Sequence, residues 1–170
     1  MVAYLKRMDT GYAGGLSREP GPGDIVNETL DSTIDWSTYG FGRPVKYTTA
    51  GKITPLASGD TSADIIGFLV RTFPGRAVSY TGLAAYPQIN GGAVPVARRG
   101  FMTVALQGAT AATKGGAVYV RVAGTSSTEV PGGIEAADDS TAGNTILLAN
   151  AQFEGPAGTD GIVEISFTIL

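Results

Sequence analysis

Glycine and proline interrupt this sequence so often that long regular elements have no room to form. The 170 residues include 25 glycines and 9 prolines, which separate short runs of alternating apolar and polar residues. Both residues destabilise helix interiors, whereas alternation with a period of two is typical of strands with one buried face. The sequence therefore predicts an all-β fold with little or no helix.

The strand pattern is clearest at the C-terminal end of the sequence. In residues 162–170 the apolar side chains share one face: Val163, Ile165, Phe167 and Ile169. Other strands are expected at residues 44–49, 53–56, 64–71, 76–80, 93–97, 101–106, 117–122, 133–137 and 145–153. A single helical turn is expected to start at Asp60 or Ser62. This spacing is typical of a single antiparallel β-sandwich or β-barrel, jelly-roll-like or β-tulip-like.

The first forty residues differ from the rest. Residues 11–24 contain five glycines and two prolines, and the next stretch mixes acids, hydroxyls and aromatics without periodicity. We predict an extended N-terminal arm over residues 1–40 and a β domain over residues 41–170. Flat side chains on an extended segment are typical anchors for a partner groove. The alternatives are a long surface loop, and a seal at one end of the barrel made by Trp36, Tyr39 and Phe41.

Charge is unevenly distributed along the sequence. Its total is −3, but residues 1–40 carry −3, residues 41–121 carry +7 and residues 122–170 carry −7. Either distant segments lie together in one β fold and mix these charges, or a bipolar molecule pairs acidic and basic faces between subunits. Basic residues form no cluster larger than Arg98–Arg99, and aromatics do not interleave with them. Nucleic acid is therefore not an expected partner.

The sequence shows no sign of secretion or membrane insertion. Its N-terminal stretch has no apolar run long enough for a signal peptide, and no segment approaches the length of a membrane span. We expect synthesis in the cytosol and no membrane partner.

The sequence contains few residues suited to catalysis or metal binding. The sequence contains neither histidine nor cysteine, which removes the usual acid–base groups and thiolate ligands. Residues 108–115 lack the glycine before the lysine and the Ser or Thr after it that a phosphate-binding loop requires. Glu135, Asp138 and Asp139 lack the ligand spacing of a calcium loop and are expected to be a solvated loop. We predict no enzyme activity, no cofactor and no metal site.

Several stretches in their order resemble the structural cement, or head decoration, proteins of tailed bacteriophages. The resemblance covers residues 40–170 and rests on segments 43–46, 49–55, 66–74, 99–104, 114–122 and 150–155. It implies a decoration domain on the outer surface of the expanded capsid, at junctions between major capsid proteins, and therefore a place in the virion. It carries no catalytic residues to transfer.

This resemblance leads to a specific contact hypothesis. The arm is expected to bridge neighbouring capsid subunits, and the body to form a homodimer or homotrimer. The expected contact residues of the arm are Tyr12, Leu16, Ile25, Trp36 and Tyr39. The main alternative is a receptor- or carbohydrate-binding β-sandwich of a phage tail or adhesin, although the aromatics of the body are scattered singly. A small glycosidase and a self-assembling shell protein are weaker alternatives.

Overall fold

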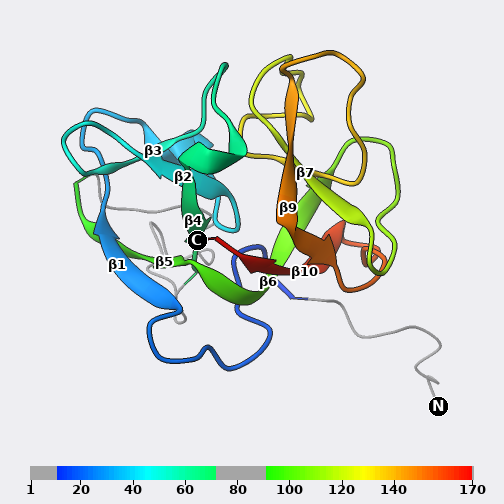
Figure 1. Ribbon diagram of the computed structural model, residues 1–170, viewed down its shortest axis with the longest axis horizontal. Helices are drawn as coiled ribbons and strands as arrows, with labels where there is room; N and C mark the ends of the chain where they lie inside the picture. Colours follow the sequence, from blue (N-terminus) through cyan, green and yellow to red (C-terminus); the bar gives the residue numbers. More distant parts are fainter. Residues whose placement is uncertain (1–10, 72–90, 170) are drawn as a thin grey trace, which may run out of the picture.

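The computed structural model describes residues 11–71 and 91–169, which form two β-sheets beside each other (Figure 1). The first sheet contains β1 (Ile25–Thr29), β2 (Pro44–Tyr47), β3 (Ile53–Pro55), β4 (Ile65–Leu69) and β5 (Ala93–Ala97). Its strand order is β1-β5-β4-β2-β3, and every neighbouring pair is antiparallel. The short strands expected at residues 44–49 and 53–56 form the hairpin of β2 and β3.

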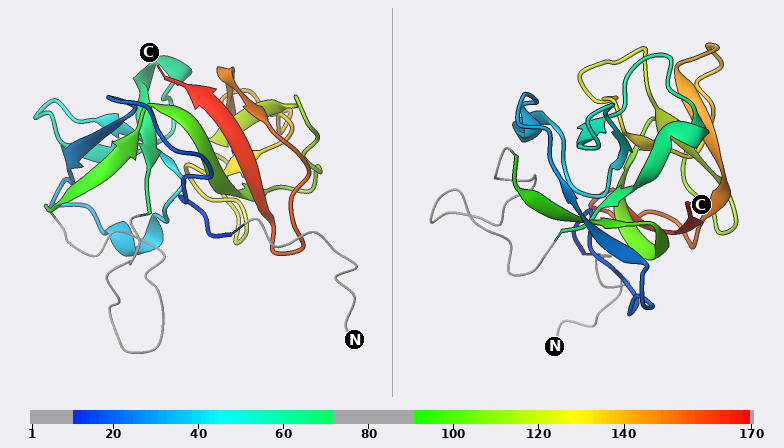
Figure 2. Two further views of the ribbon diagram at one scale, coloured as in Figure 1. Left: turned by 90° about the horizontal axis from the view of Figure 1, so that it is seen from below. Right: turned by 60° about the vertical axis from the view of Figure 1, so that its left-hand side comes forward.

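The second sheet closes into a barrel. It contains β6 (Arg99–Gln107), β7 (Ala117–Arg121), β8 (Ile134–Glu135), β9 (Thr145–Phe153) and β10 (Ile162–Thr168), in the order β10-β6-β8-β7-β9. The short β8 runs parallel to β6, and the other barrel pairs are antiparallel. Only Arg98 separates β5 from β6, so the chain passes directly from the first sheet into the barrel (Figure 2).

The all-β prediction is confirmed. Helical structure in the described residues is limited to two short 3₁₀ turns, η1 (Trp36–Thr38) and η2 (Ser62–Asp64), and η2 lies where a single turn was expected. Within residues 11–71 and 91–169, no helix has the length and apolar character that crossing a membrane requires. The strand expected at residues 76–80 falls outside the described residues.

The barrel encloses the larger core. Along β10, Val163, Ile165 and Phe167 are buried while the residues between them are only half-buried, as their alternation predicts. Phe167 packs against Phe68 of β4, with ring centroids 4.6 Å apart, so this core continues into the first sheet. Burying one such side chain stabilises the fold by about 1.5–3 kcal/mol.

A second core covers the opposite face of the first sheet. Neighbouring residues of a strand point to opposite faces, so Phe68 faces the barrel core while Leu69 faces the second core. The buried members of the second core are Leu30, Trp36, Tyr39, Val45, Ile53, Leu69 and Val96. The segment around Trp36 therefore shields a sheet face that would otherwise expose apolar side chains to water.

The N-terminal segment is joined to the rest of the chain in the structure. β1 pairs with β5 over five consecutive residues, and Leu30 and Trp36 are fully buried. Residues 25–41 thus pack on the body instead of extending from it, because they complete both the edge and the second core of the first sheet. A functional division at residue 40 stays a prediction.

Candidate functional site

Two of the five expected contact residues lie inside the chain's own core. Trp36 is fully buried, and its Nε1–H donates a 2.9 Å hydrogen bond to the carbonyl of Asp31. Tyr39 packs edge-to-face on Trp36, and its hydroxyl donates to the carbonyl of Pro44. Burial raises the pKa of Tyr39 well above the usual phenol value. Both side chains are therefore buried within the chain itself, in the second core of the first sheet and not in the barrel core.

Leu16 and Ile25 are half-buried against the barrel core. Leu16 forms an isolated antiparallel bridge with Met102 of β6. Ile25 begins β1 opposite Ala97 of β5. Part of each side chain therefore supports the fold, and only the remainder is free to contact another molecule.

Tyr12 is the most accessible of the five. Its relative exposure is 60 %, and the guanidinium of Arg71 lies 4.7 Å from its ring centroid. The backbone carbonyl of Tyr12 accepts a 2.6 Å hydrogen bond from the hydroxyl of Thr103, which fixes the segment while leaving the ring outside. A cation over an aromatic face contributes about 0.5–1 kcal/mol at an exposed site.

The glycine-rich stretch after Tyr12 is held along β6. The amide of Gly14 donates to the carbonyl of Thr103 at 2.6 Å, and the amide of Thr103 donates to the carbonyl of Gly15 at 2.8 Å. Gly14 has a φ of 83°, and a Cβ there would lie 2.6 Å from the Cβ of Phe41. Glycine is required at this position because both its backbone angle and its close packing exclude a larger residue.

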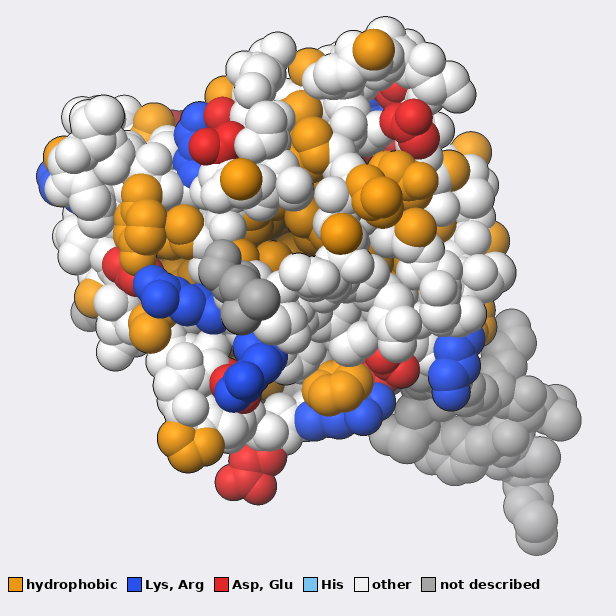
Figure 3. All heavy atoms as spheres, in the orientation of Figure 1, with side chains coloured by type: hydrophobic (Ala, Val, Ile, Leu, Met, Phe, Trp, Pro, Cys, Tyr) orange, Lys and Arg blue, Asp and Glu red, His pale blue; other side chains and the backbone are white. Residues whose placement is uncertain are grey.

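Basic and aromatic side chains gather where this stretch crosses β6. We call the group of Tyr12, Arg18, Arg71, Arg99 and Phe101 the N-terminal face. The guanidinium of Arg18 lies 3.5 Å from the ring centroid of Phe101. Figure 3 shows blue and orange side chains side by side along the lower part of the molecule. Such a surface suits a partner that is apolar and acidic.

A buried ion network occupies the opposite end of the barrel. Arg121 is 2 % exposed and forms a bidentate pair with Glu135, with Nε–Oε1 at 2.5 Å and Nη2–Oε2 at 3.0 Å. Its Nη1 also bonds Asp139 at 2.9 Å and the carbonyls of Ala123 and Gly124. These partners, Glu135 first, raise the pKa of Arg121 above its usual value. The network ties the β7–β8 and β8–β9 loops to strand β8 at the barrel end.

Sequence reasoning missed this network. It treated Glu135 and Asp139 as part of a solvated loop, whereas both carboxylates bond Arg121 and Glu135 is buried. Within the described ranges, no group of three or more possible ligands is arranged to hold a metal ion. The sequence did contain one signal for this network. Arg121 is the last basic residue before a segment whose charged residues are all acidic.

The charge segments mix within one molecule. Arg98 and Arg99 of the basic middle segment pair with acids of the first forty residues, at 3.1 Å with Glu28 and 2.6 Å with Asp24. Arg18 likewise lies 3.5 Å from Glu164 of the acidic final segment. Intramolecular pairing therefore accounts for part of the charge pattern, and pairing between subunits stays a prediction.

Comparison with known proteins identifies related chains. A family model described as structural cement protein (E217 gp24/Pam3 gp6) matches residues 2–168. A search of curated proteins gives no match. Among solved structures, a chain from the capsid of Myoviridae phage XM1 has a TM-score of 0.63 and 20 % sequence identity. That alignment covers 98 % of this chain and 97 % of the other, and at this identity it shows a shared fold.

Proposed function

Because the chain belongs to the phage structural cement protein family, we propose that it binds the outer surface of the expanded head and bridges neighbouring major capsid proteins. The match over residues 2–168 carries this proposal. The shared fold with a chain of the XM1 capsid supports it. The protein acts as a structural component of the virion and not as an enzyme.

The physical task of such a protein is to oppose the pressure of packaged DNA on the seams between shell subunits. Contacts to two shell subunits at once gain from a high effective concentration, so several weak contacts hold firmly together. A body that transmits force between those contacts has to resist deformation. The core shared by Phe68 and Phe167 joins the two sheets and suits that task.

The N-terminal face is the surface we assign to the shell. Tyr12 supplies exposed aromatic area, and the half-buried Leu16 and Ile25 supply smaller apolar contacts. Trp36 and Tyr39 are buried in the second core and contribute to the fold of the N-terminal segment instead. Self-association into a dimer or trimer on the capsid completes the proposal, with basic surfaces meeting acidic ones.

Co-sedimentation tests the proposed function. Purified protein is mixed with expanded heads stripped of their cement protein, and in parallel with unexpanded precursor shells. Saturable binding to expanded heads alone is the expected result. Absence of binding to either particle contradicts the capsid assignment and favours a tail or receptor-binding module.

Variants of Tyr12 test the assigned surface in the same assay. Tyr12→Ala removes the exposed ring and is expected to weaken binding to expanded heads about tenfold, as for an interface anchor. Tyr12→Phe is the matched control because it keeps the ring and is expected to bind nearly as the unaltered protein does. Equal binding by all three proteins would place the contact elsewhere.

A further inference from the structure

Strands β9 and β10 pair at one end and separate at the other. Their ladder joins residues 151–153 of β9 to residues 165–167 of β10 and stops there. On its other side β9 pairs with β7 at Gln152 and next at Leu148. Ala149 and Asn150 therefore belong to a β-strand but lie in a register shift opposite Ala117 and Val118, and neither has a ladder partner in β7 or in β10.

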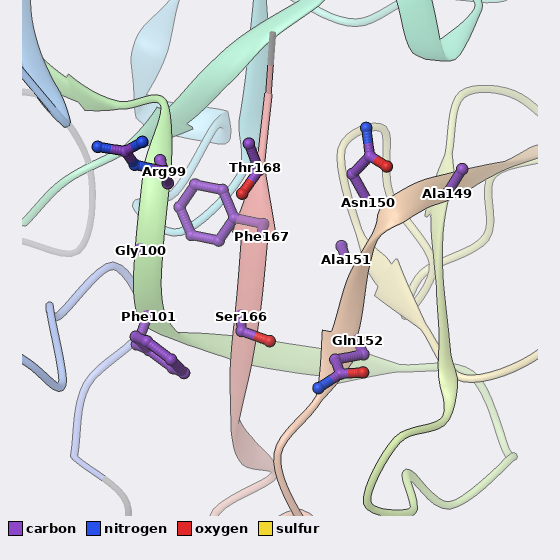
Figure 4. Close-up of a pocket in the computed structure, with 10 residues that line it drawn as sticks. All are labelled: Arg99, Gly100, Phe101, Ala149, Asn150, Ala151, Gln152, Ser166, Phe167 and Thr168. Carbon is purple, nitrogen blue, oxygen red and sulfur yellow. The ribbon is translucent and has the colours of Figure 1, made fainter.

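Strand β10 has no ladder partner in β9 beyond Phe167. Thr168 pairs with Arg99 of β6, and the amide of Ile169 donates to the carbonyl of Arg98 at 2.7 Å. Both contacts lie on the β6 side of β10. Figure 4 shows Thr168 and Asn150 on strands that have diverged, with space between them.

A groove follows this separation, and we call it the β9–β10 groove. It consists of two pockets, of about 350 and 180 Å³, that share Ala149, Asn150 and Thr168. The larger reaches Arg99 and Phe101, and the smaller is floored by Ile65, Leu148 and Ile169. Figure 3 shows a hollow with an apolar floor between the two sheets.

The chemistry of the groove favours one kind of occupant. Unpaired strand backbone recruits another strand, because an added strand satisfies its amides and carbonyls. The apolar floor accepts an aliphatic side chain. Among the described residues that line the two pockets, Arg99 is charged and none is an Asp or Glu. Arg99 is 60 % exposed in its side chain, so it remains accessible beside its partner Asp24.

We propose that the β9–β10 groove binds an extended, acidic segment of a partner protein as an added β-strand. The inference rests on the proposed function, because it takes that partner to be the capsid shell protein. The groove adjoins the N-terminal face at Arg99 and Phe101, so one shell protein can contact both. Backbone pairing gives affinity, and the arginine and the apolar floor select the segment.

Hydrogen exchange on the full chain tests strand addition directly. Exchange in residues 147–153 is measured for the free protein and for the protein bound to expanded heads. The amides of Ala149 and Asn150, which lie outside both ladders, are expected to exchange about tenfold more slowly, or slower still, when the heads are bound. The exposed loop at residues 125–128 serves as the internal reference and is expected to be unchanged.

The outcomes separate this inference from the proposed function. Binding to heads without protection at residues 147–153 overturns strand addition and leaves the cement function intact. No binding to heads overturns both. Protection that appears in the free protein as its concentration rises assigns the groove to a second copy of this chain and also overturns the inference.

Charge variants at Asn150 test the acidic character of the segment. Asn150→Asp places a negative charge on an exposed residue of the groove and is expected to weaken head binding about fivefold. Asn150→Lys is expected to bind at least as tightly as the unaltered protein. Ser127→Asp introduces the same charge on an exposed loop and is the matched control. Equal affinities for both Asn150 variants contradict an acidic occupant.

Discussion

Trp36 combines the largest side chain of the second core with a satisfied indole N–H. It is fully buried, and its hydrogen bond to the carbonyl of Asp31 fixes its orientation. Trp36→Ala leaves a cavity beneath the first sheet and removes the indole donor to the carbonyl of Asp31. We expect the free energy of unfolding to fall by about 3–5 kcal/mol, measured by urea denaturation.

The exposed Tyr12 provides the contrast for this prediction. Tyr12→Ala is expected to change the free energy of unfolding by less than about 0.5–1 kcal/mol, since the ring has mostly solvent around it. If Trp36→Ala were equally mild, the tryptophan would not belong to the core of the free protein. Its role as a contact with the shell would then regain support.

A second prediction concerns Arg121, which is buried and whose charge is balanced by the carboxylates of Glu135 and Asp139. Arg121→Met removes the cation and leaves Glu135, which is 4 % exposed, without a partner. We expect a loss of about 3–5 kcal/mol in the free energy of unfolding. The double variant Arg121→Met with Glu135→Leu is expected to be more stable than Arg121→Met alone, since it removes the stranded charge. Additive losses in this cycle would show that the pair is not coupled.

At the scale of single elements, Gly67 allows β4 to approach β5. Its φ is 153°, and a Cβ there would lie 2.5 Å from the carbonyl oxygen of Ala97. Gly100 has a similar φ of 132° but open space around it. Substitution by alanine strains the backbone at both sites, on the order of 1–3 kcal/mol, but only Gly67→Ala adds a steric clash. We expect Gly67→Ala to be less stable by a further ~1–3 kcal/mol, measured as the difference between their urea unfolding curves. Equal losses would mean that β4 and β5 move apart easily.

The strands of the barrel were predictable because their pattern is local. In β10 the alternation of Val163, Ile165 and Phe167 with polar residues gives both the strand and its buried face. The order of the strands, and the parallel contact of β8 with β6, depend on long-range packing that alternation does not encode.

The N-terminal segment was harder to predict for a related reason. Its residues lack periodicity, yet Trp36 shares the second core with Leu69 of β4 and Val96 of β5. Tyr12 was identified as a candidate contact residue and is exposed. The β9–β10 groove left no trace in the sequence, because it results from where two ladders end.

At the scale of the whole molecule, ion pairs join segments that are distant in sequence. Arg99 of β6 bonds Asp24 ahead of β1, and Arg98 bonds Glu28 within β1. These pairs fasten the N-terminal segment to the junction of the two sheets. The carboxylate of Asp24 also makes the stability of the molecule depend on pH.

Among the residues that the structure describes, six carboxyl groups have a pKa below their usual values: Asp24, Asp31, Asp35, Asp64, Asp139 and Glu154. A hydrogen bond from the Arg99 side chain is the main cause of the lowered pKa of Asp24. A hydrogen bond from the side-chain amide of Asn144 is the main cause of the lowered pKa of Asp139. A lowered folded-state pKa means that the unfolded chain binds protons first as the pH falls. The resulting stabilisation is complete above the ordinary values of 3.8 for Asp and 4.5 for Glu and disappears as the pH falls through the folded-state values.

We therefore expect the urea midpoint to fall steeply below about pH 4.5 and to change little between pH 6 and 7, where the sequence has no histidine or cysteine to titrate. Asp24→Asn should lower the midpoint at pH 7 because it removes the ion pair with Arg99, and it should flatten the decline in acid because residue 24 then has no carboxylate to protonate. Ser127→Asp, in an exposed loop, serves as a control and should retain the decline. A midpoint that stays constant down to pH 3 would mean that these carboxylates keep their pairing in the unfolded chain. The ion pairs would then not be what fastens the N-terminal segment to the body.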